Sequence, residues 1–357
     1  MTQINAWPGF HKMPNPYARA LYERITRRGI RVDDFDPRRF LVTHAQLWHI
    51  HGPDYLVNTK GVLRSALRVF GFSLLLCYAR LRRICILWTI NNVQSHERYH
   101  PLLEKTLWRV FVTCLDGYIA YSRAGQRRAL ERFPALAKKP AWLIPHGHYR
   151  GLYPVVVSRD AARARLGVPA HVRAYLFFGS VRAYKNVPGL INAFVRRSAR
   201  DAWLIVAGHP SPPELGRQIE SLAAQDSRIR LMLDLVPDDE VQYYFQAADI
   251  VVLPFSDILN SGSAMLALSF DRPVVVPRLG AMEELRASIG PDWVWTYDGA
   301  LTAETLDLAL EWACGNERAQ VAPLSGLDWG TIAESTVAAY EGLVGMKARP
   351  ANSSAQR

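Results

Sequence analysis

The sequence has few cysteines and no long apolar run, and both shortages exclude classes of protein. Its four cysteines lie far apart in 357 residues, without a C-x-x-C pair or a histidine cluster beside them. This spacing argues against structural zinc and against a disulfide framework. No stretch of eighteen apolar residues occurs, and the N-terminus lacks a basic segment followed by an apolar one. We therefore expect a protein of the reducing cytoplasm, without a transmembrane span or a signal peptide.

Acidic residues are scarce in the first part of the chain. Residues 1–200 carry 33 Lys and Arg against 10 Asp and Glu, whereas residues 201–357 carry 10 against 22. A basic half implies an anionic partner, which is nucleic acid, anionic lipid or a phosphorylated substrate. Composition alone does not choose among these three.

The length predicts more than one domain, because 357 residues with 49% hydrophobic content exceed one compact core. We assign residues 1–155 to a first domain and residues 156–346 to a second, whose last helix can pack back on the first. Prolines and a short arginine-rich helix make residues 151–170 the linker candidate. The polar residues 347–357 are expected to form a disordered tail.

Apolar runs of strand length alternate with helical patterns through the second half of the chain. The predicted strands are 174–179, 203–208, 228–233, 249–254 and 273–277. The predicted helices are 187–199, 212–225, 238–247, 262–270 and 281–289. Strands that are apolar throughout are typical of a parallel sheet covered on both faces, so this half is a doubly wound α/β domain.

The first half alternates in the same way, though less regularly. The predicted elements are helices at 15–28, 60–82 and 99–114, an extended run at 40–50, and strands at 84–90, 118–121 and 142–144. The predicted fold class is therefore α/β, with two Rossmann-like doubly wound domains.

Two loops that follow predicted strands in the second half suit an anion. In the first, Gly179 lets the backbone approach a ligand, and Arg182 and Lys185 offer cations to a diphosphate. The second loop, residues 260–263, leaves N–H groups at the start of an apolar helix. The structural alternatives are a solvated basic loop and an ordinary helix cap. The candidates for binding the diphosphate are Arg182, Lys185, Ser261, Gly262 and Ser263, and the further candidates beside them are Gly179, Tyr184 and Asn260.

Further residues of the second half are weaker candidates. His209 lies in a Gly-His-Pro turn, for which a turn is the simpler explanation. Glu283 and Glu284 begin a helix, and only Glu283 is kept as a possible partner of a ribose or sugar hydroxyl.

Two loops of the first half mix imidazole, carboxylate and amide groups, the set needed for a general base and its orienting partners. These loops, at 48–55 and 91–97, contain His51, Asp54, Asn91, Asn92, His96 and Glu97. A structural histidine is the alternative for each. His146 and His148 fall near the expected domain crossing and lack the partners of a zinc site. Asp34 and Asp36 form a D-x-D that we assign to a turn.

The helix at 61–83 combines arginines with Leu, Phe and Val around an apolar centre of about ten residues, too short to cross a bilayer. It suits either a protein core or a membrane surface. The positive charge of this half favours the membrane surface.

These loops resemble a known family. The matching segments are G-S-V-R-A-Y-K-N at 179–186, A-D-I-V-V-L-P-F at 248–255, N-S-G-S at 260–263 and R-P-V-V-V-P at 272–277. They resemble the donor domain of GT-B glycosyltransferases. Asn15 and Tyr17 before the first helix, the loops at 48–55 and 91–97, and I-P-H-G-H-Y-R at 144–150 narrow the resemblance to bacterial exopolysaccharide β-mannosyltransferases of the xanthan type.

The resemblance implies two domains facing across a cleft, with the nucleotide sugar on the second and the acceptor on the first. Family members of this type use GDP-mannose and a polyprenyl-diphosphate-linked saccharide. The resemblance also implies that Arg182 and Lys185 hold the diphosphate. Retaining GT-B enzymes carry two glutamates at positions that correspond to Ile258 and Leu266 here. Their absence argues against a retaining enzyme of that kind and removes the usual ribose ligand.

We therefore predict an inverting, metal-independent glycosyltransferase of exopolysaccharide synthesis, without a cofactor. The base is expected to be His96 or Glu97, and next Asp54. The enzyme is expected to lie peripherally on the anionic inner face of the plasma membrane and to bind no nucleic acid. The competing hypotheses are a nucleotide-sugar-binding protein without catalysis and a basic nucleic-acid-binding protein.

Overall fold

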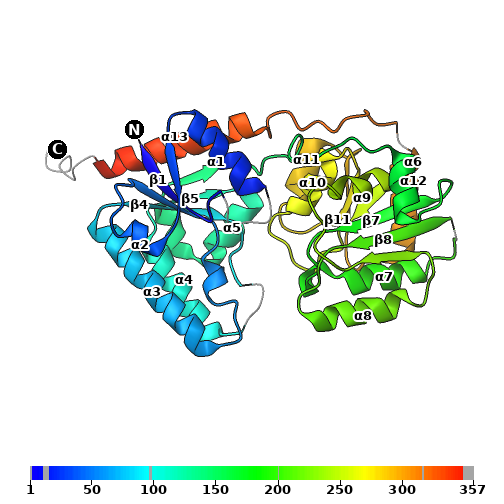
Figure 1. Ribbon diagram of the computed structural model, residues 1–357, viewed down its shortest axis with the longest axis horizontal. Coiled ribbons are helices and arrows are strands. Elements are labelled where there is room, and N and C mark those ends of the chain that lie inside the picture. Colours follow the sequence, from blue (N-terminus) through cyan, green and yellow to red (C-terminus); the bar gives the residue numbers. More distant parts are fainter. Residues whose placement is uncertain (1, 11–15, 96–98, 200, 316, 349–357) are drawn as a thin grey trace. The chain divides into compact units, whose positions relative to one another are not determined.

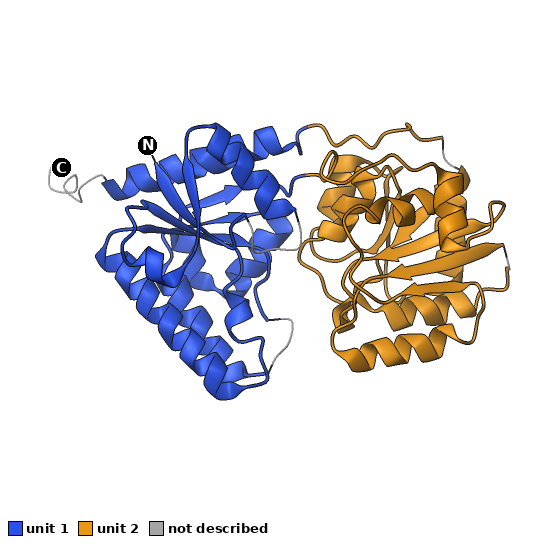
Figure 2. Ribbon diagram, in the orientation of Figure 1, with its two compact units in different colours: residues 1–147, 326–357 blue, residues 148–325 orange. Residues whose placement is uncertain are grey.

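A computed structural model describes residues 2–10, 16–95, 99–199, 201–315 and 317–348. The predicted site residues Asn15, His96 and Glu97 lie outside these ranges. The chain divides into two compact units, residues 1–147 with 326–357 and residues 148–325, which Figure 2 distinguishes by colour.

Unit 1 is built on a six-stranded parallel sheet in the order β2-β1-β3-β4-β5-β6 (Figure 1). The strands are β1 Gln3–Trp7, β2 Arg31–Asp34, β3 Leu47–Ile50, β4 Cys85–Ile90, β5 Gly117–Ala120 and β6 Ala141–Leu143. The helices are α1 Tyr17–Arg27, α2 Pro37–Phe40, α3 Val62–Leu81, α4 Pro101–Cys114, α5 Arg123–Arg132 and α13 Trp329–Ala348. Short 3₁₀ turns occupy Pro53–Leu56 and Pro134–Lys138. The central strands β3 and β4 are buried along their whole length, as apolar strands between two helical layers must be.

Unit 2 has a second six-stranded parallel sheet, in the order β12-β11-β10-β7-β8-β9. The strands are β7 Arg173–Phe178, β8 Ala202–Ala207, β9 Ile229–Met232, β10 Ile250–Val252, β11 Val274–Pro277 and β12 Val294–Tyr297. The helices are α6 Arg159–Leu166, α7 Val187–Val195, α8 Pro213–Ala223, α9 Val241–Ala247, α10 Gly262–Ser269, α11 Met282–Ile289 and α12 Ala303–Gly315. A 3₁₀ turn occupies Ala183–Lys185. The predicted fold of two doubly wound α/β domains is confirmed.

Each sheet has one point at which the strand order reverses. In unit 1 the chain runs from β1 outward to β2 and then returns to β3 on the other side of β1. In unit 2 it runs from β7 to β9 and returns to β10 on the other side of β7. Ligands of open α/β sheets bind beyond the carboxyl ends of the strands at this switch point. We therefore expect ligands to bind at the loops after β1 and β3 in unit 1, and at those after β7 and β10 in unit 2.

Two expected elements differ from the structure. The extended run at 40–50 is a strand only at Leu47–Ile50, because Pro37 at the start of α2 and the Asp36 side chain, which caps the amides of Arg38 and Arg39, form a short helix that ends at Phe40. The D-x-D assigned to a turn therefore joins a strand to a helix, because Asp34 ends β2 and Asp36 caps α2.

The second difference is at the linker, since the boundary falls between Gly147 and His148 instead of after residue 155. The Tyr149 amide donates to Ser269 Oγ, and Arg150 binds Asp271, so this segment is anchored to unit 2.

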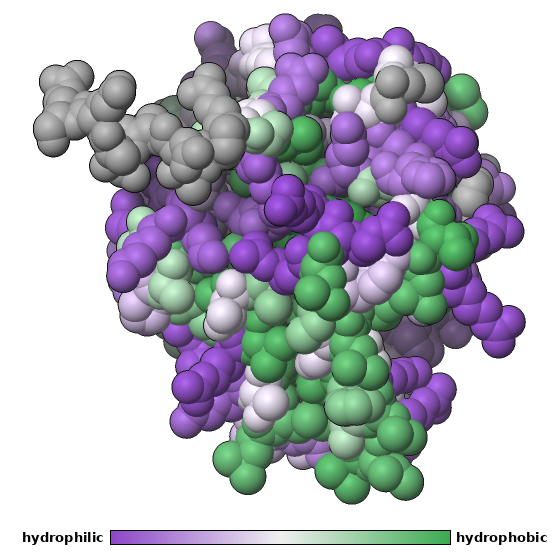
Figure 3. Space-filling view, turned by 90° about the vertical axis from the view of Figure 1, so that its left-hand side faces the viewer, coloured by the Kyte–Doolittle hydropathy of each residue, from purple (hydrophilic) through white to green (hydrophobic). Residues whose placement is uncertain are grey.

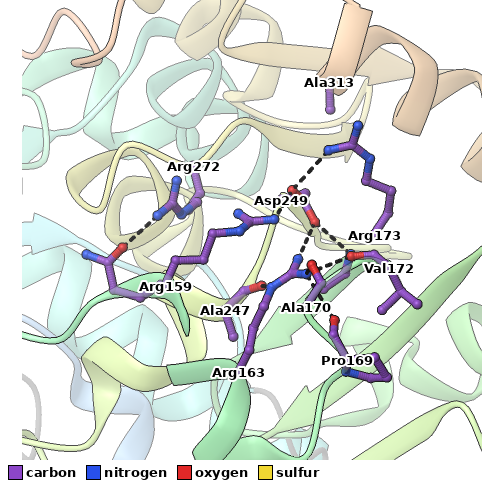
Figure 4. Close-up of polar contacts among 12 residues, drawn as sticks. Arg159, Arg163, Pro169, Ala170, Val172, Arg173, Ala247, Asp249, Arg272 and Ala313 are labelled. Carbon is purple, nitrogen blue, oxygen red and sulfur yellow. Dashed lines mark hydrogen bonds and ion pairs between the residues drawn. The ribbon is translucent and has the colours of Figure 1, made fainter. Parts of the chain in front are cut away.

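The rest of the expected linker is held by one buried carboxylate. Asp249 lies just before β10 and accepts from Arg159 and Arg163 of α6 and from the Ala174 amide of β7. Figure 4 shows these arginines around Asp249, together with the nearby Arg173. Arg163 also donates to the carbonyls of Pro169, Ala170, Val172 and Ala247. The residues before β7 are thus part of the unit 2 core.

The structural boundary changes the expected charge division. Unit 1 carries 26 Lys and Arg against 12 Asp and Glu, and unit 2 carries 17 against 20. The excess of positive charge belongs to unit 1, but it is smaller than the division at residue 200 suggested, because the arginines of α6 and β7 lie in unit 2.

Candidate functional site

Three residues of the predicted donor site meet at the switch point of unit 2. Gly179 follows β7, Lys185 ends the next 3₁₀ turn, and Ser263 lies in the first turn of α10. A Cβ added to Gly179 would stand 2.8 Å from Ser263 Oγ and 3.1 Å from Lys185 Nζ. Gly179 also has a φ of +129°, a conformation that side chains disfavour. Because Gly179 has no Cβ, the hydroxyl of Ser263 and the ammonium group of Lys185 can both lie close to its backbone.

Lys185 is buried, at 8% exposure, and the described part of the chain shows no hydrogen bond or ion pair for its ammonium group. Burial, with a smaller contribution from the nearby Arg182 charge, lowers the pKa of Lys185 to about 8. A buried cation without a partner is costly, so it is retained where a ligand supplies the missing charge. Arg182 is half-buried beside it.

The loops after the neighbouring strands are bonded to this loop. The Val181 amide donates to His209 O at 2.9 Å, and the Ser211 amide donates to Val181 O at 2.8 Å. The His209 side chain itself is exposed. On the other side, the Ser256 amide donates to the carbonyl of Tyr184, the candidate between Arg182 and Lys185. These bonds fix the donor loop between the loops that follow β8 and β10.

The start of α10 combines a cap with unused amide groups. Ser261 Oγ accepts from the Ala264 amide at 3.0 Å, as the cap interpretation expected. In the described structure no acceptor binds the N–H groups of Gly262 and Ser263, which point out of the helix start as in any first turn. Asn260, just before them, is half-buried. The start of α10 therefore has both a Ser261 cap and two available amide donors, and these donors favour the binding of an anion.

The carboxylates of the retaining pattern are replaced by apolar side chains. Leu266 is buried within α10, and the loop at Ile258 packs on Gly280, whose added Cβ would lie 2.2 Å from Ile258 O. Glu283 is engaged by Arg278 at 2.5 Å and by Arg286 at 3.2 Å. A ribose contact from Glu283 stays a prediction, and it would have to compete with these two arginines.

The switch point of unit 1 holds a buried carboxylate. Asp54 lies in the turn after β3 and is 2% exposed. Burial raises its pKa to about 7, and the negative charge of Glu104 adds to the shift, against a backbone hydrogen bond. A carboxyl group that titrates near neutrality suits a general base.

Glu104 connects this turn with the loop after β4. It accepts from the Ser95 amide at 2.6 Å and from Trp108 Nε1 at 3.3 Å. Ser95 Oγ in turn donates to Asn58, four residues after Asp54. The predicted loop at 91–97 is therefore bonded to the segment that follows the loop at 48–55. The half-buried Asn91 and Asn92 lie at the start of the loop at 91–97. We call these two loops the acceptor loops.

His51, the other candidate after β3, belongs to a buried polar network. Its Nε2 lies 2.6 Å from the hydroxyl of Tyr22 on α1. Burial lowers the pKa of His51 to about 3, which leaves the ring neutral. His49 Nδ1 lies 2.7 Å from the Tyr340 hydroxyl of α13, and His49 Nε2 lies 2.7 Å from Thr89 Oγ1 of β4.

This network was not predicted, because Tyr340 lies 291 residues after His49 in the chain. The period-two pattern of β3 was the available signal, since it places His49 and His51 on one face of the strand. The network fixes α1 and α13 to the sheet.

An aromatic cluster surrounds the predicted Tyr17 and His146 of unit 1. The His146 ring centroid lies 4.7 Å from that of Tyr17 and 5.3 Å from that of Tyr121. Trp329 closes the cluster at 5.2 Å from Tyr17. His146 Nδ1 is bonded to Gly147 O, and burial lowers the pKa of His146 to about 4. His146 is therefore a weak base, while the half-buried His148 is the first residue of unit 2.

Within the described residues, no group of three or more His, Cys, Asp and Glu side chains is arranged to hold a metal ion. The expectation of metal-independent chemistry stays a prediction.

Comparisons with known proteins agree with this geometry. Residues 173–305, which contain the donor loops, match the family described as Glycosyl transferases group 1. A GDP-mannose:glycolipid 4-beta-D-mannosyltransferase of Xanthomonas campestris pv. campestris is 28% identical over 322 residues, which are 90% of this chain and 86% of that protein. A D-inositol 3-phosphate glycosyltransferase of Corynebacterium efficiens is 31% identical over 43% of this chain and 38% of its own.

Solved structures share the fold. Sucrose-phosphate synthase from Thermosynechococcus elongatus superposes with a TM-score of 0.69 at 17% identity, covering 97% of this chain and all of that one. Anabaena HepE in complex with UDP and glucose gives a TM-score of 0.67 at 15% identity, covering 96% of this chain and all of that one.

The fold, the donor loops and these relatives define a class, the GT-B glycosyltransferases. The part of the chain that contains the donor loops is similar to glycosyltransferases of group 1, and the predicted resemblance to GT-B glycosyltransferases is confirmed.

Proposed function

We propose that this enzyme transfers mannose from GDP-mannose to a lipid-linked saccharide acceptor in exopolysaccharide synthesis. The observation that carries the proposal is that Lys185 Nζ and Ser263 Oγ both lie close to the backbone of Gly179 at the switch point of unit 2. The choice of sugar and acceptor rests on the named activity of the Xanthomonas relative, which is similar over nine-tenths of this chain.

The donor site suits a departing diphosphate. When the sugar–oxygen bond breaks, negative charge develops on the diphosphate, and preorganised donors lower the barrier by stabilising that charge. Lys185 supplies an unpaired ammonium group, and the amides of Gly262 and Ser263 supply two N–H donors. Arg182 adds a second cation beside Lys185. These groups do the work that a metal ion does in other sites, so transfer proceeds without one.

The acceptor hydroxyl loses its proton to a base of unit 1 as it attacks the anomeric carbon. Because Ile258 and Leu266 replace the two glutamates of the retaining pattern, we assign inversion. Asp54 is the described candidate for the base, since its pKa of about 7 lets it accept a proton at neutral pH. His96 and Glu97 of the joined loop are the other candidates.

The outer face of α3 favours a membrane-bound acceptor. Five apolar residues at helical spacing on this face are each more than half exposed, namely Leu63, Leu67, Phe70, Leu74 and Leu81. The opposite face of α3 is buried in unit 1 through Val69, Phe72 and Leu76. Figure 3 shows apolar side chains gathered in the lower half of this side of the molecule, with hydrophilic ones beside them.

Contrary to the expectation from its apolar centre of about ten residues, the whole helix Val62–Leu81 is long and apolar enough to cross a membrane by length and composition. Its buried face belongs to the domain core, however, so we propose that α3 lies on the membrane surface and does not span it. Basic residues lie on α3 itself, at Arg64 and Arg68, and on the exposed side of the adjacent α4, at Lys105 and Arg109. Basic groups beside an apolar face suit anionic lipid.

The same helix leads to the acceptor loops. Ser65 Oγ, in the first turn of α3, is bonded to Thr59 Oγ1 at 2.7 Å, and His100 Nε2 lies 2.8 Å from Thr59 O. A lipid-linked acceptor held along α3 would therefore carry its saccharide toward Asp54. We therefore propose that the enzyme lies on the inner face of the plasma membrane.

The test is a thermal-shift panel of GDP, UDP, ADP and dTDP, followed by incubation with GDP-mannose and a bacterial lipid-linked saccharide fraction. A nucleotide that binds raises the melting temperature by mass action. We expect the largest rise with GDP, and β-linked mannose in the lipid product. A larger rise with UDP, or transfer of another sugar, would overturn the donor assignment. An α-linked product would overturn inversion.

A further inference from the structure

A cavity of about 400 Å³ lies in unit 1 at the amino ends of β3 and β4, opposite the ends that carry the predicted loops. Arg82, Arg83 and Lys347 line it together with His44, and none of its lining residues is a carboxylate. A cavity of this size holds a small ligand, and a lining with positive charge alone selects an anion.

Among the described residues, two of the three cations have no ion-pair partner. Lys347 is paired with Asp116 at 2.8 Å and also donates to Ile84 O. Arg82 donates to the hydroxyl of Tyr78 at 2.7 Å, and the described residues offer neither Arg82 nor Arg83 an ion pair. The guanidinium groups of these two neighbours are therefore available to an oxygen-rich anion, which they bind through several N–H donors.

Arg83 occupies a backbone position at which glycine is normally preferred. It follows α3 with a φ of +56°, and its amide donates to Arg80 O while the Ile84 amide donates to Ala79 O. This is the left-handed residue that ends a helix, where a side chain strains the backbone. The Arg83 side chain thus lines the cavity from a backbone position that glycine would occupy with less strain.

The cavity opens beside exposed apolar residues. Leu81 ends α3 at 83% exposure, and Leu41 and Val42 are exposed by 49% and 76%. The Tyr78 hydroxyl donates to Leu41 O at 2.5 Å, so these residues lie together next to Arg82. They continue the apolar outer face of α3 to the mouth of the cavity.

We propose that this cavity binds the phosphate of an anionic phospholipid headgroup, with Arg82, Arg83 and His44 on the phosphate and the apolar rim toward the acyl chains. The inference rests on the membrane association proposed above and adds a specific lipid site to it. The site lies at the amino ends of the strands, beside the C-terminal end of α3, whereas the acceptor loops lie beside its N-terminal end. A lipid in the cavity and the acceptor in its loops would therefore hold both ends of α3 on the membrane.

The test measures binding to vesicles of phosphatidylcholine with and without phosphatidylglycerol. General attraction to a charged surface costs about fivefold in binding per arginine removed, wherever the arginine lies along α3. We expect R82Q/R83Q to lose about tenfold more binding to phosphatidylglycerol vesicles than the matched pair R64Q/R68Q, because it also loses charge-assisted hydrogen bonds. Equal losses in the two pairs would overturn the lipid site while leaving membrane association intact. Absence of wild-type binding to either vesicle would overturn both.

Two further arms separate the lipid from a soluble phosphate and from a folding defect. Glycerol phosphate at constant ionic strength should compete only weakly, because it lacks the acyl chains. Strong competition, or a thermal shift by inorganic phosphate that R82Q/R83Q abolishes, would assign the cavity to a soluble ligand instead. R83G removes the backbone strain, so we expect an unchanged or higher melting temperature together with weaker lipid binding. Unchanged lipid binding in R83G would overturn the role of Arg83.

Discussion

The two units repeat one fold but place different chemistry at the same point of it. In each, the strand order reverses once, and the loops at the reversal carry the candidate residues. Unit 2 presents an unpaired lysine with a serine around a glycine, which suits a departing anion. Unit 1 presents a buried carboxyl group, which suits proton transfer. A doubly wound sheet thus specifies where a site forms, and the loop residues specify what it does.

The units differ also in their surfaces. Unit 1 carries the excess of positive charge and the exposed apolar face of α3, whereas unit 2 has slightly more acidic than basic residues. This contrast agrees with the proposal that unit 1 binds the membrane and the acceptor, whereas unit 2 binds the nucleotide sugar. The following predictions test that division of labour.

The largest effect is expected from Lys185→Met in unit 2. Loss of one preorganised donor to a developing charge lowers kcat by about 10²–10³-fold. The melting temperature should not fall, because the substitution removes a buried unpaired charge. Both quantities come from steady-state assays and thermal unfolding, with the exposed Arg217→Ala of α8 as the control. Activity within tenfold of wild type would show that Lys185 does not hold the leaving group.

Asp54→Asn tests the corresponding group of unit 1. If Asp54 is the base, kcat falls by about 10²-fold or more, and donor binding to unit 2 is unchanged. The wild-type rate should fall below pH 7, because protonation of a group with a pKa of about 7 removes the base. Full activity of Asp54→Asn with the same pH profile would transfer the role to His96 or Glu97.

Glu104→Gln sharpens the Asp54 assignment. It removes the negative charge that helps to raise the pKa of Asp54, so the acidic limb of the pH profile should move to lower pH. The folded pKa of Asp54 lies above its usual 3.8, so the folded state binds the proton more tightly. The contribution of Asp54 to stability therefore falls as the pH rises from about 4 to 7, and Asp54→Asn should be the more stable protein at neutral pH.

A smaller effect is expected from polar substitutions on α3. Leu67→Ser with Phe70→Ser should weaken vesicle binding by tenfold or more, since burying each side chain in the interface is worth about 1.5–3 kcal/mol when complete. The matched control is Leu235→Ser with Leu308→Ser, two exposed leucines of unit 2. Flotation assays measure both pairs. Equal loss of vesicle binding in the two pairs would show that the exposed apolar residues of unit 1 have no special role in membrane binding.

Sequence patterns located unit 2 better than unit 1. Five strands of unit 2 were placed within a few residues, because each is an apolar run followed by a helix. β1 and β2 were not predicted, since Gln3–Trp7 and Arg31–Asp34 are short and partly polar. α12 and α13 were not assigned bounds, because their apolar residues do not form one clear stripe.

The candidate site residues of unit 2 were also predicted better than the contacts around Asp54 in unit 1. Glycine, lysine and serine in the loops after β7 and β10 are local signals, and the structure brings Gly179, Lys185 and Ser263 together. The links between Asp54, Glu104 and Ser95 depend on contacts between separate loops, which no local pattern records. For the same reason the bond between His49 and Tyr340 could not be foreseen.

The smallest effect is expected from Tyr340→Phe, which tests how α13 is fixed to unit 1. The Tyr340 hydroxyl contacts Nδ1 of the buried His49, and the loss of one buried hydrogen bond costs about 1 kcal/mol. We expect a lower unfolding midpoint for unit 1 and unchanged nucleotide affinity, because the donor residues all lie in unit 2. Tyr243→Phe of α9, whose hydroxyl has no partner in the described structure, should change neither quantity. A fall in nucleotide affinity in Tyr340→Phe would mean that the packing of α13 reaches the donor site, and the separation between the units would then not hold.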